Sequence, residues 1–127
     1  MKVAVAASGK TLESLVDPRF GRAAWFLVVT LPSEEVEVVE NAAREAVRGA
    51  GIGAAQQLVD AGVKAVIAGN FGPNAARMLR VAGVKVYAAD PRKTVRQALV
   101  EFKAGRLAEL ALPPAGGGWG RGRRGGW

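Results

Sequence analysis

The chain has 127 residues, a formal net charge of +7 at neutral pH, and neither cysteine nor histidine. This length fits one domain with a substantial buried core. The missing residue types exclude disulfides, thiolate nucleophiles, imidazole bases and the strongest side-chain ligands for zinc, copper and most iron centres.

The first part of the chain predicts three strands. Residues 2–7, 23–30 and 36–40 are rich in β-branched or aromatic residues or alternate between apolar and polar side chains. Leu31–Glu34 contains a proline and reads as a turn, so the second and third strands are expected to form an antiparallel hairpin. The segment between the first two strands, residues 8–20, is expected to be a loop.

The second part predicts alternating helices and strands. Helices are expected over residues 51–61, 74–81 and 94–103, with strands at 63–68 and 84–88 between them. Gly62, Gly83 and Gly105 provide the stop signals, and Thr94 is a good N-cap for the last helix. In the first helix the apolar positions expected to face the core are Ile52, Ala55, Leu58 and Val59.

Strand–helix–strand units require parallel pairing, so a mixed sheet covered by helices on both faces is the simplest arrangement. No apolar run approaches the roughly 20 residues of a membrane span, which predicts a cytoplasmic protein with no membrane partner. From residue 113 the chain becomes rich in glycine, proline, arginine and tryptophan. We therefore expect a folded domain over residues 1–112 and a flexible tail over 113–127.

Glycine-bearing segments follow two of the predicted parallel strands, and ligands of α/β sheets bind at the carboxyl ends of such strands. Ser8 and Gly9 follow the first strand, and Gly69–Pro73 follows the fourth. Ala89 and Asp90 follow the fifth and are expected to converge with them. Gly72 and Pro73 also open a helix, where free amide groups can face an anion. The same glycines would serve equally well in tight turns.

The segment from Asp17 to Arg22 allows two interpretations. Phe20 beside Gly21, flanked by Arg19 and Arg22, would form an anion-accepting lip with an aromatic wall. Alternatively, Phe20 anchors the loop in the core and both arginines are solvated. Asn41, at the end of the hairpin, is either a ligand contact or a turn residue.

Taken together, these motifs carry a resemblance. The segments 17–23, 40–41, 49–51, 69–75 and 84–87 resemble, in order and spacing, the dinitrogenase iron-molybdenum cofactor biosynthesis family over about residues 1–110, as a small stand-alone member. The resemblance implies a three-layer α/β/α, ribonuclease H-like fold with a five-stranded mixed sheet containing one antiparallel hairpin strand. It also implies a role related to nitrogen fixation, with cofactor-assembly proteins as partners.

The sequence hypothesis is a non-enzymatic carrier of the iron-molybdenum cofactor or an iron-sulfur precursor cluster, held at the carboxyl edge of the sheet without direct coordination of metal. The guest is an anionic metallocluster or a small anionic ligand. The residues expected to bind it are Ser8, Gly9, Arg19, Phe20, Gly21, Arg22, Asn41, Gly69, Asn70, Gly72 and Asn74.

The alternative is an adaptor or RNA-binding protein that acts through its basic tail, with no cofactor. Arg121, Arg123 and Arg124 carry three of the seven net positive charges, which leaves +4 for residues 1–120. Arginines interleaved with glycine and tryptophan are typical of segments that bind single-stranded nucleic acid.

Overall fold

The structure is a computed structural model that describes residues 1–110, and these form three helices and six strands. The predictions for residues 113–127 therefore lie outside the described residues, as does the predicted domain boundary at residue 112. The elements are β1 (Lys2–Ala7), β2 (Trp25–Thr30), β3 (Glu35–Glu40), α1 (Ala50–Asp60), β4 (Val63–Ala68), α2 (Pro73–Val81), β5 (Lys85–Ala88), α3 (Val95–Lys103) and β6 (Ala108–Glu109).

All strands belong to one mixed sheet with the order β3-β2-β1-β4-β5-β6. The three central strands β1, β4 and β5 are parallel, whereas β2 pairs antiparallel with β1 and β3, and β6 pairs antiparallel with β5. The predicted five strands and the hairpin are present, but the prediction of five strands in total is wrong. The sixth strand has only two residues, which is too short for any alternation of polar and apolar side chains to reveal.

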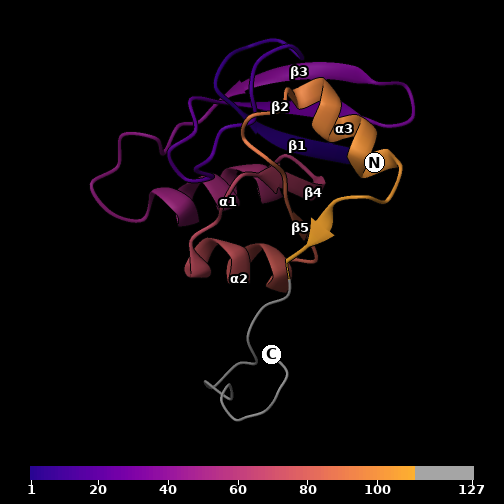
Figure 1. Ribbon diagram of the computed structural model, residues 1–127. Helices are drawn as coiled ribbons and strands as arrows, with labels where there is room; N and C mark the ends of the chain where they lie inside the picture. Colours follow the sequence, from indigo (N-terminus) through magenta and orange to yellow (C-terminus); the bar gives the residue numbers. More distant parts are fainter. Residues whose placement is uncertain (111–127) are drawn as a thin grey trace.

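Helices cover both faces of the sheet (Figure 1). Helices α1 and α2 lie side by side over one face, where Leu58 and Leu79 join a buried cluster with Val66 of β4 and Val86 of β5. Helix α3 covers the other face, where its Val95, Ala98 and Leu99 join Val3 and Val5 of β1. Strand β1 is thus buried on both sides, which explains why its sequence is apolar almost throughout.

The helices end as their sequences predict. Gly62, Gly83 and Gly105 follow α1, α2 and α3 with φ angles of 81°, 84° and 72°, the left-handed region that favours glycine. Within α1, however, Ile52 is 44% exposed, and Ala50 and Ala54 are buried instead. The prediction that Ile52 faces the core is wrong, because α1 packs on the sheet through its alanines.

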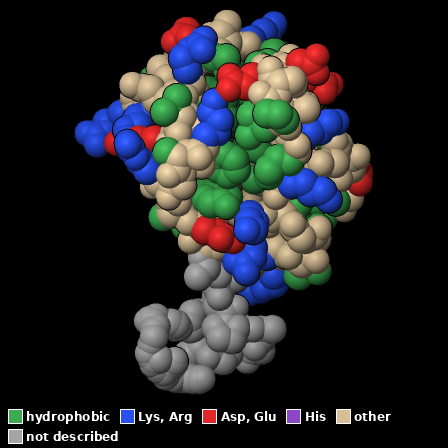
Figure 2. Space-filling view, turned by 90° about the vertical axis from the view of Figure 1, so that its right-hand side faces the viewer, with side chains coloured by type: hydrophobic (Ala, Val, Ile, Leu, Met, Phe, Trp, Pro, Cys, Tyr) green, Lys and Arg blue, Asp and Glu red, His purple; other side chains and the backbone are tan. Residues whose placement is uncertain are grey.

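Strand β3 forms one edge of the sheet, and its glutamates Glu35, Glu37 and Glu40 are exposed. Charged side chains on an open edge oppose pairing with a strand of another molecule. Figure 2 shows the end of the molecule at which the N-terminus lies, where hydrophobic side chains gather with lysines and arginines around them. Among residues 1–110, no helix is long and apolar enough to cross a lipid bilayer.

Candidate functional site

The carboxyl ends of the parallel strands lie at the opposite end of the molecule from the face in Figure 2. A pocket of about 290 Å³ opens there, between the first turns of α1 and α2 and the loop that contains Gly21. Its lining comes from three separate stretches of chain, namely Gly21 and Arg22, Gly49–Ile52, and Gly72–Ala75. Two helix N-termini thus meet at one cavity.

Both helices begin without a side-chain cap. The bond from Gly53 N to Gly49 O opens α1, and the bond from Ala76 N to Gly72 O opens α2. The amides that precede Gly53 and Ala76 are the donors that a helix start leaves without an intrahelical acceptor. Because Pro73 has no N–H, Asn74 and Ala75 supply these donors in α2. The positive ends of two helix dipoles therefore face a shared space.

Close backbone packing brings these segments together. A Cβ on Gly21 would lie 2.7 Å from the amide nitrogen of Gly51, and one on Gly51 would lie 3.1 Å from the Cβ of Ala75. The loop therefore rests directly on the start of α1, and α1 rests on the start of α2. Larger residues at these positions would push the walls of the pocket apart.

Arg22 is the charged side chain in the pocket lining. Its Nη1 donates to the carbonyl oxygens of Arg44 at 2.8 Å and Ala46 at 2.6 Å, which ties the segment before α1 to the loop. No carboxylate lines this pocket within the part of the chain that the structure describes. The pocket therefore offers one guanidinium and several main-chain amides, a set of donors that suits an anion.

Four of the predicted site residues, Gly21, Arg22, Gly72 and Asn74, line this pocket. Gly49–Ile52 line it as well but were not among the predicted binding residues. Glycine and alanine carry no reactive side chain, so their residue type alone does not mark them as binding residues. The signal that could have found them is the glycine-rich sequence at a predicted helix start.

Four further predicted residues support the pocket from behind. Phe20 is only 1% exposed and stacks between Phe26 and Phe71, with ring centroids 5.3 and 5.0 Å away. It anchors the loop in the core, which matches the alternative interpretation, and presents no aromatic wall to a ligand. Gly69 and Asn70 hold the same loop, since Gly69 N donates to Asp17 O and Phe20 N donates to Asn70 O.

Asn41 is buried and holds both ends of the Gly21 segment. Its Nδ2 donates to Gly21 O at 3.0 Å and to Ala23 O at 2.9 Å, and its Oδ1 accepts from the amide of Ala43. Both N–H donors and one of the two Oδ1 lone pairs are thus occupied by the protein's own backbone. Asn41 therefore positions the pocket loop. Of the two interpretations, ligand contact or turn residue, these bonds favour the turn residue.

The remaining three predicted residues, Ser8, Gly9 and Arg19, lie outside the pocket lining. Ser8 N donates to Leu15 O, and a Cβ on Gly9 would meet the Ser14 Oγ at 2.5 Å, so this loop folds on itself. The Arg19 side chain is 67% exposed, with its Nε 4.0 Å from Asp17 Oδ1. The structure therefore does not gather the predicted residues into one site.

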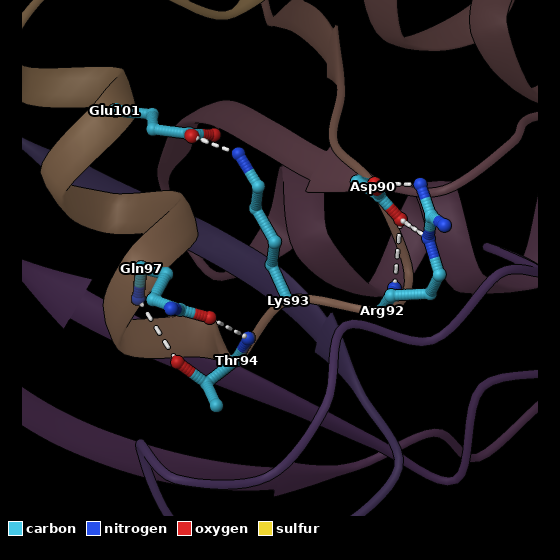
Figure 3. A network of polar contacts seen from close by, with 6 residues as sticks. All are labelled: Asp90, Arg92, Lys93, Thr94, Gln97 and Glu101. Carbon is cyan, nitrogen blue, oxygen red and sulfur yellow. Dashed lines mark hydrogen bonds and ion pairs between the residues drawn. The ribbon is translucent and has the colours of Figure 1, made fainter.

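The segment after β5 also stays apart from the pocket. The Asp90 carboxylate accepts hydrogen bonds from the backbone amide, Nε and Nη2 of Arg92 (Figure 3). These hydrogen bonds, those of the Arg92 side chain first, lower the pKa of the carboxyl to about 2. Next to it, Lys93 pairs with Glu101, and Thr94 and Gln97 form a reciprocal capping box at the start of α3. This network fixes α3 and lines no part of the pocket.

The fold and the pocket define an α/β protein with a pocket between two helix starts at the carboxyl edge of a mixed sheet. The chain belongs to the dinitrogenase iron-molybdenum cofactor family, whose sequence profile matches residues 1–105. This membership confirms the resemblance that the sequence motifs carry.

Individual relatives agree with this assignment. The apo form of the orange protein from Desulfovibrio gigas superposes with a TM-score of 0.85 at 43% identity, covering 89% of this chain and 95% of that one. A NifB-like protein from Thermotoga gives a TM-score of 0.76 at 42% identity, covering 91% and 98%. An uncharacterised protein of Methanocaldococcus jannaschii is 31% identical, covering 87% of this chain and 92% of its own.

Proposed function

We propose that this protein is a non-enzymatic carrier that holds an anionic metallocluster, the iron-molybdenum cofactor or an iron-sulfur precursor, in the pocket between α1 and α2. The observation that carries the proposal is the convergence of two uncapped helix N-termini and Arg22 on one cavity without a carboxylate in its lining. Membership of the iron-molybdenum cofactor family supports the choice of guest. A relative whose structure is that of an apo form supports the proposal, because an apo form is a protein without its bound group.

The donor set determines how the cluster is held. The chain has no cysteine or histidine, and no group of three or more acidic residues within residues 1–110 could hold a metal ion. In this proposal N–H groups bind the outer, negatively charged atoms of the cluster, because the sequence supplies no thiolate or imidazole to coordinate its iron. Such charge-assisted hydrogen bonds are shorter and stronger than neutral ones. A guest held in this way can be released intact.

The experiment measures uptake of isolated iron-molybdenum cofactor by the purified full chain under argon. Gel filtration separates free from bound cofactor, and elemental analysis gives iron and molybdenum per protein. The decisive variant is Asn74→Glu, which puts a carboxylate in the pocket at a helix start, where negative charge is favourable for the fold. We expect an uptake at least tenfold lower than that of the wild type with no loss of thermal stability.

The matched control is Arg19→Ala, because Arg19 belongs to the same loop but lies outside the pocket lining. It should take up the cofactor like the wild type. Equal uptake by Asn74→Glu and wild type, or an equally large loss in Arg19→Ala, would contradict the assignment of this pocket. A wild-type chain that takes up no cofactor would contradict the carrier function itself.

A further inference from the structure

A second and larger cavity, of about 490 Å³, lies along the outer side of α1 and α2. We call it the helix groove, and it is lined by Ile52, Gln56, Val59, Asn74, Arg77, Met78, Val81 and Ala82. Two of these are large apolar side chains with much of their surface in water, namely Val81 at 82% exposed and Ile52 at 44%. Exposed apolar surface that is gathered in a hollow indicates a binding surface.

The spacing of the lining residues shows what shape the groove accepts. Ile52, Gln56 and Val59 are separated by four and three residues, so they follow one face of α1 over its length. Asn74, Met78 and Val81 have the same spacing on α2. The two helices lie side by side (Figure 1), and residues of both stripes line the cavity, so the stripes form the two walls of a channel. A channel of this form fits the apolar face of a third helix.

The charges around the groove determine which sign of charge a partner must carry. Among residues 1–110, Arg77 is the charged residue in its lining, and α2 carries no acid. Arg80 of α2 does not line the groove, and its Nη1 donates to Leu110 O. The single carboxylate of α1 and α2, on Asp60, accepts a hydrogen bond of 2.8 Å from Gln56 Nε2 and does not line the groove. A partner helix with acidic residues beside its apolar face is therefore complementary to this surface.

The groove adjoins the pocket at the starts of α1 and α2, because Ile52 and Asn74 line both cavities. A protein seated in the groove therefore stands at the mouth of the pocket. This position suits a partner that supplies the guest or receives it.

We infer that the helix groove docks an acidic amphipathic helix of a protein that delivers the cluster or takes it over. The inference rests on the proposed carrier function for the identity of the partner, while the groove and its charge stand independently of that function. The partner is recognised by its apolar stripe and flanking carboxylates, and docking aligns its own cluster site with the pocket.

The test uses a labelled synthetic helix with leucines at i, i+4 and i+7 and glutamates on its flanks. A second peptide has lysine in place of every glutamate, and binding to the cluster-free full chain is followed by fluorescence anisotropy. We expect the acidic peptide to bind at least tenfold more tightly than the basic one. Val81→Glu should weaken binding of the acidic peptide at least tenfold.

The matched control is Val100→Glu, which changes an exposed valine of α3 outside the groove and should leave peptide binding unchanged. Equal affinity for both peptides, or equal losses in the two variants, would overturn the inference. A wild-type dimer that Val81→Glu dissociates would also overturn it, because the groove would then be covered by a second copy.

Val81→Glu should still take up isolated cofactor. The two proposals can therefore fail separately, one in the peptide assay and the other in the uptake assay.

Discussion

Gly21 and Gly51 approach so closely that a Cβ on Gly21 would lie 2.7 Å from the nitrogen and 2.8 Å from the Cα of Gly51. Because the obstacle is backbone, no side-chain rotation relieves it. Gly21→Ala should lower the free energy of unfolding by about 1–3 kcal/mol, the usual cost of overpacking. Chemical denaturation measures this loss.

Gly72→Ala is the companion variant, since Gly72 has an ordinary φ of −69° and open space around its Cα. Its loss of stability should be the smaller of the two. The opposite order would show that the contact between the loop and α1 is loose.

Asn41 provides a second test of how the pocket loop is held. Asn41→Ala leaves the carbonyl oxygens of Gly21 and Ala23 and the amide of Ala43 without their partner. Buried polar groups that lose a partner cost about 1–3 kcal/mol. We expect a loss in this range, measured by urea denaturation.

Asn70→Ala is the control for Asn41→Ala, because the Asn70 side chain accepts from the exposed amide of Phe71. Its effect should stay below about 1 kcal/mol. If both variants lose equal stability, Asn41 does not have the special role assigned to it.

The Asp90–Arg92 pair predicts a specific pH dependence. The pKa of the Asp90 carboxyl is lowered from 3.8 to about 2, chiefly by hydrogen bonds from Arg92. A lowered pKa means that the pair contributes stability above pH 3.8 and loses it as the pH falls towards 2. Carboxyl NMR should show Asp90 titrating near pH 2 in the wild type and at a higher pH in Arg92→Ala, which loses the side-chain bonds but keeps the backbone bond. Titration of both proteins near pH 4 would refute the pairing.

Thr94 caps α3 through its hydroxyl, which accepts from the amide of Gln97 at 3.1 Å. Thr94→Ala should lower the free energy of unfolding by about 1 kcal/mol, as N-cap replacements do. Thr94→Ser keeps the hydroxyl and should retain most of the stability. Thermal unfolding distinguishes them, and equal midpoints for the two variants would show that the cap is unimportant.

Much of the fold follows from local patterns in the sequence. The hairpin, the alternation of helices and strands, the glycine stops and the Thr94 cap all depend on neighbouring residues, and the structure contains each of them. Strand β6 depends on pairing with Tyr87 and Ala88. The exposure of Ile52 depends on which face of α1 meets the sheet, and no local pattern determines either feature.

The pocket was harder to predict than the fold. The sequence placed the candidate site at the carboxyl edge of the sheet, where Gly21, Arg22, Gly72 and Asn74 line a pocket. It could not separate lining residues from supporting ones, because Phe20 and Asn41 act through burial and hydrogen bonds to distant segments. Every residue except proline carries a main-chain amide, so the sequence could not show which amides near the start of α1 would line the pocket.

Backbone hydrogen bonds hold the loop from Asp17 to Gly21 at the end of the sheet. Asp17 N donates to Ala6 O of β1, Gly69 N donates to Asp17 O, and Phe20 N donates to Asn70 O. The loop thus behaves as a continuation of the central strands and cannot swing outward alone. A ligand of the pocket would therefore have to enter and leave on the solvent side, past the starts of α1 and α2, and not through the loop.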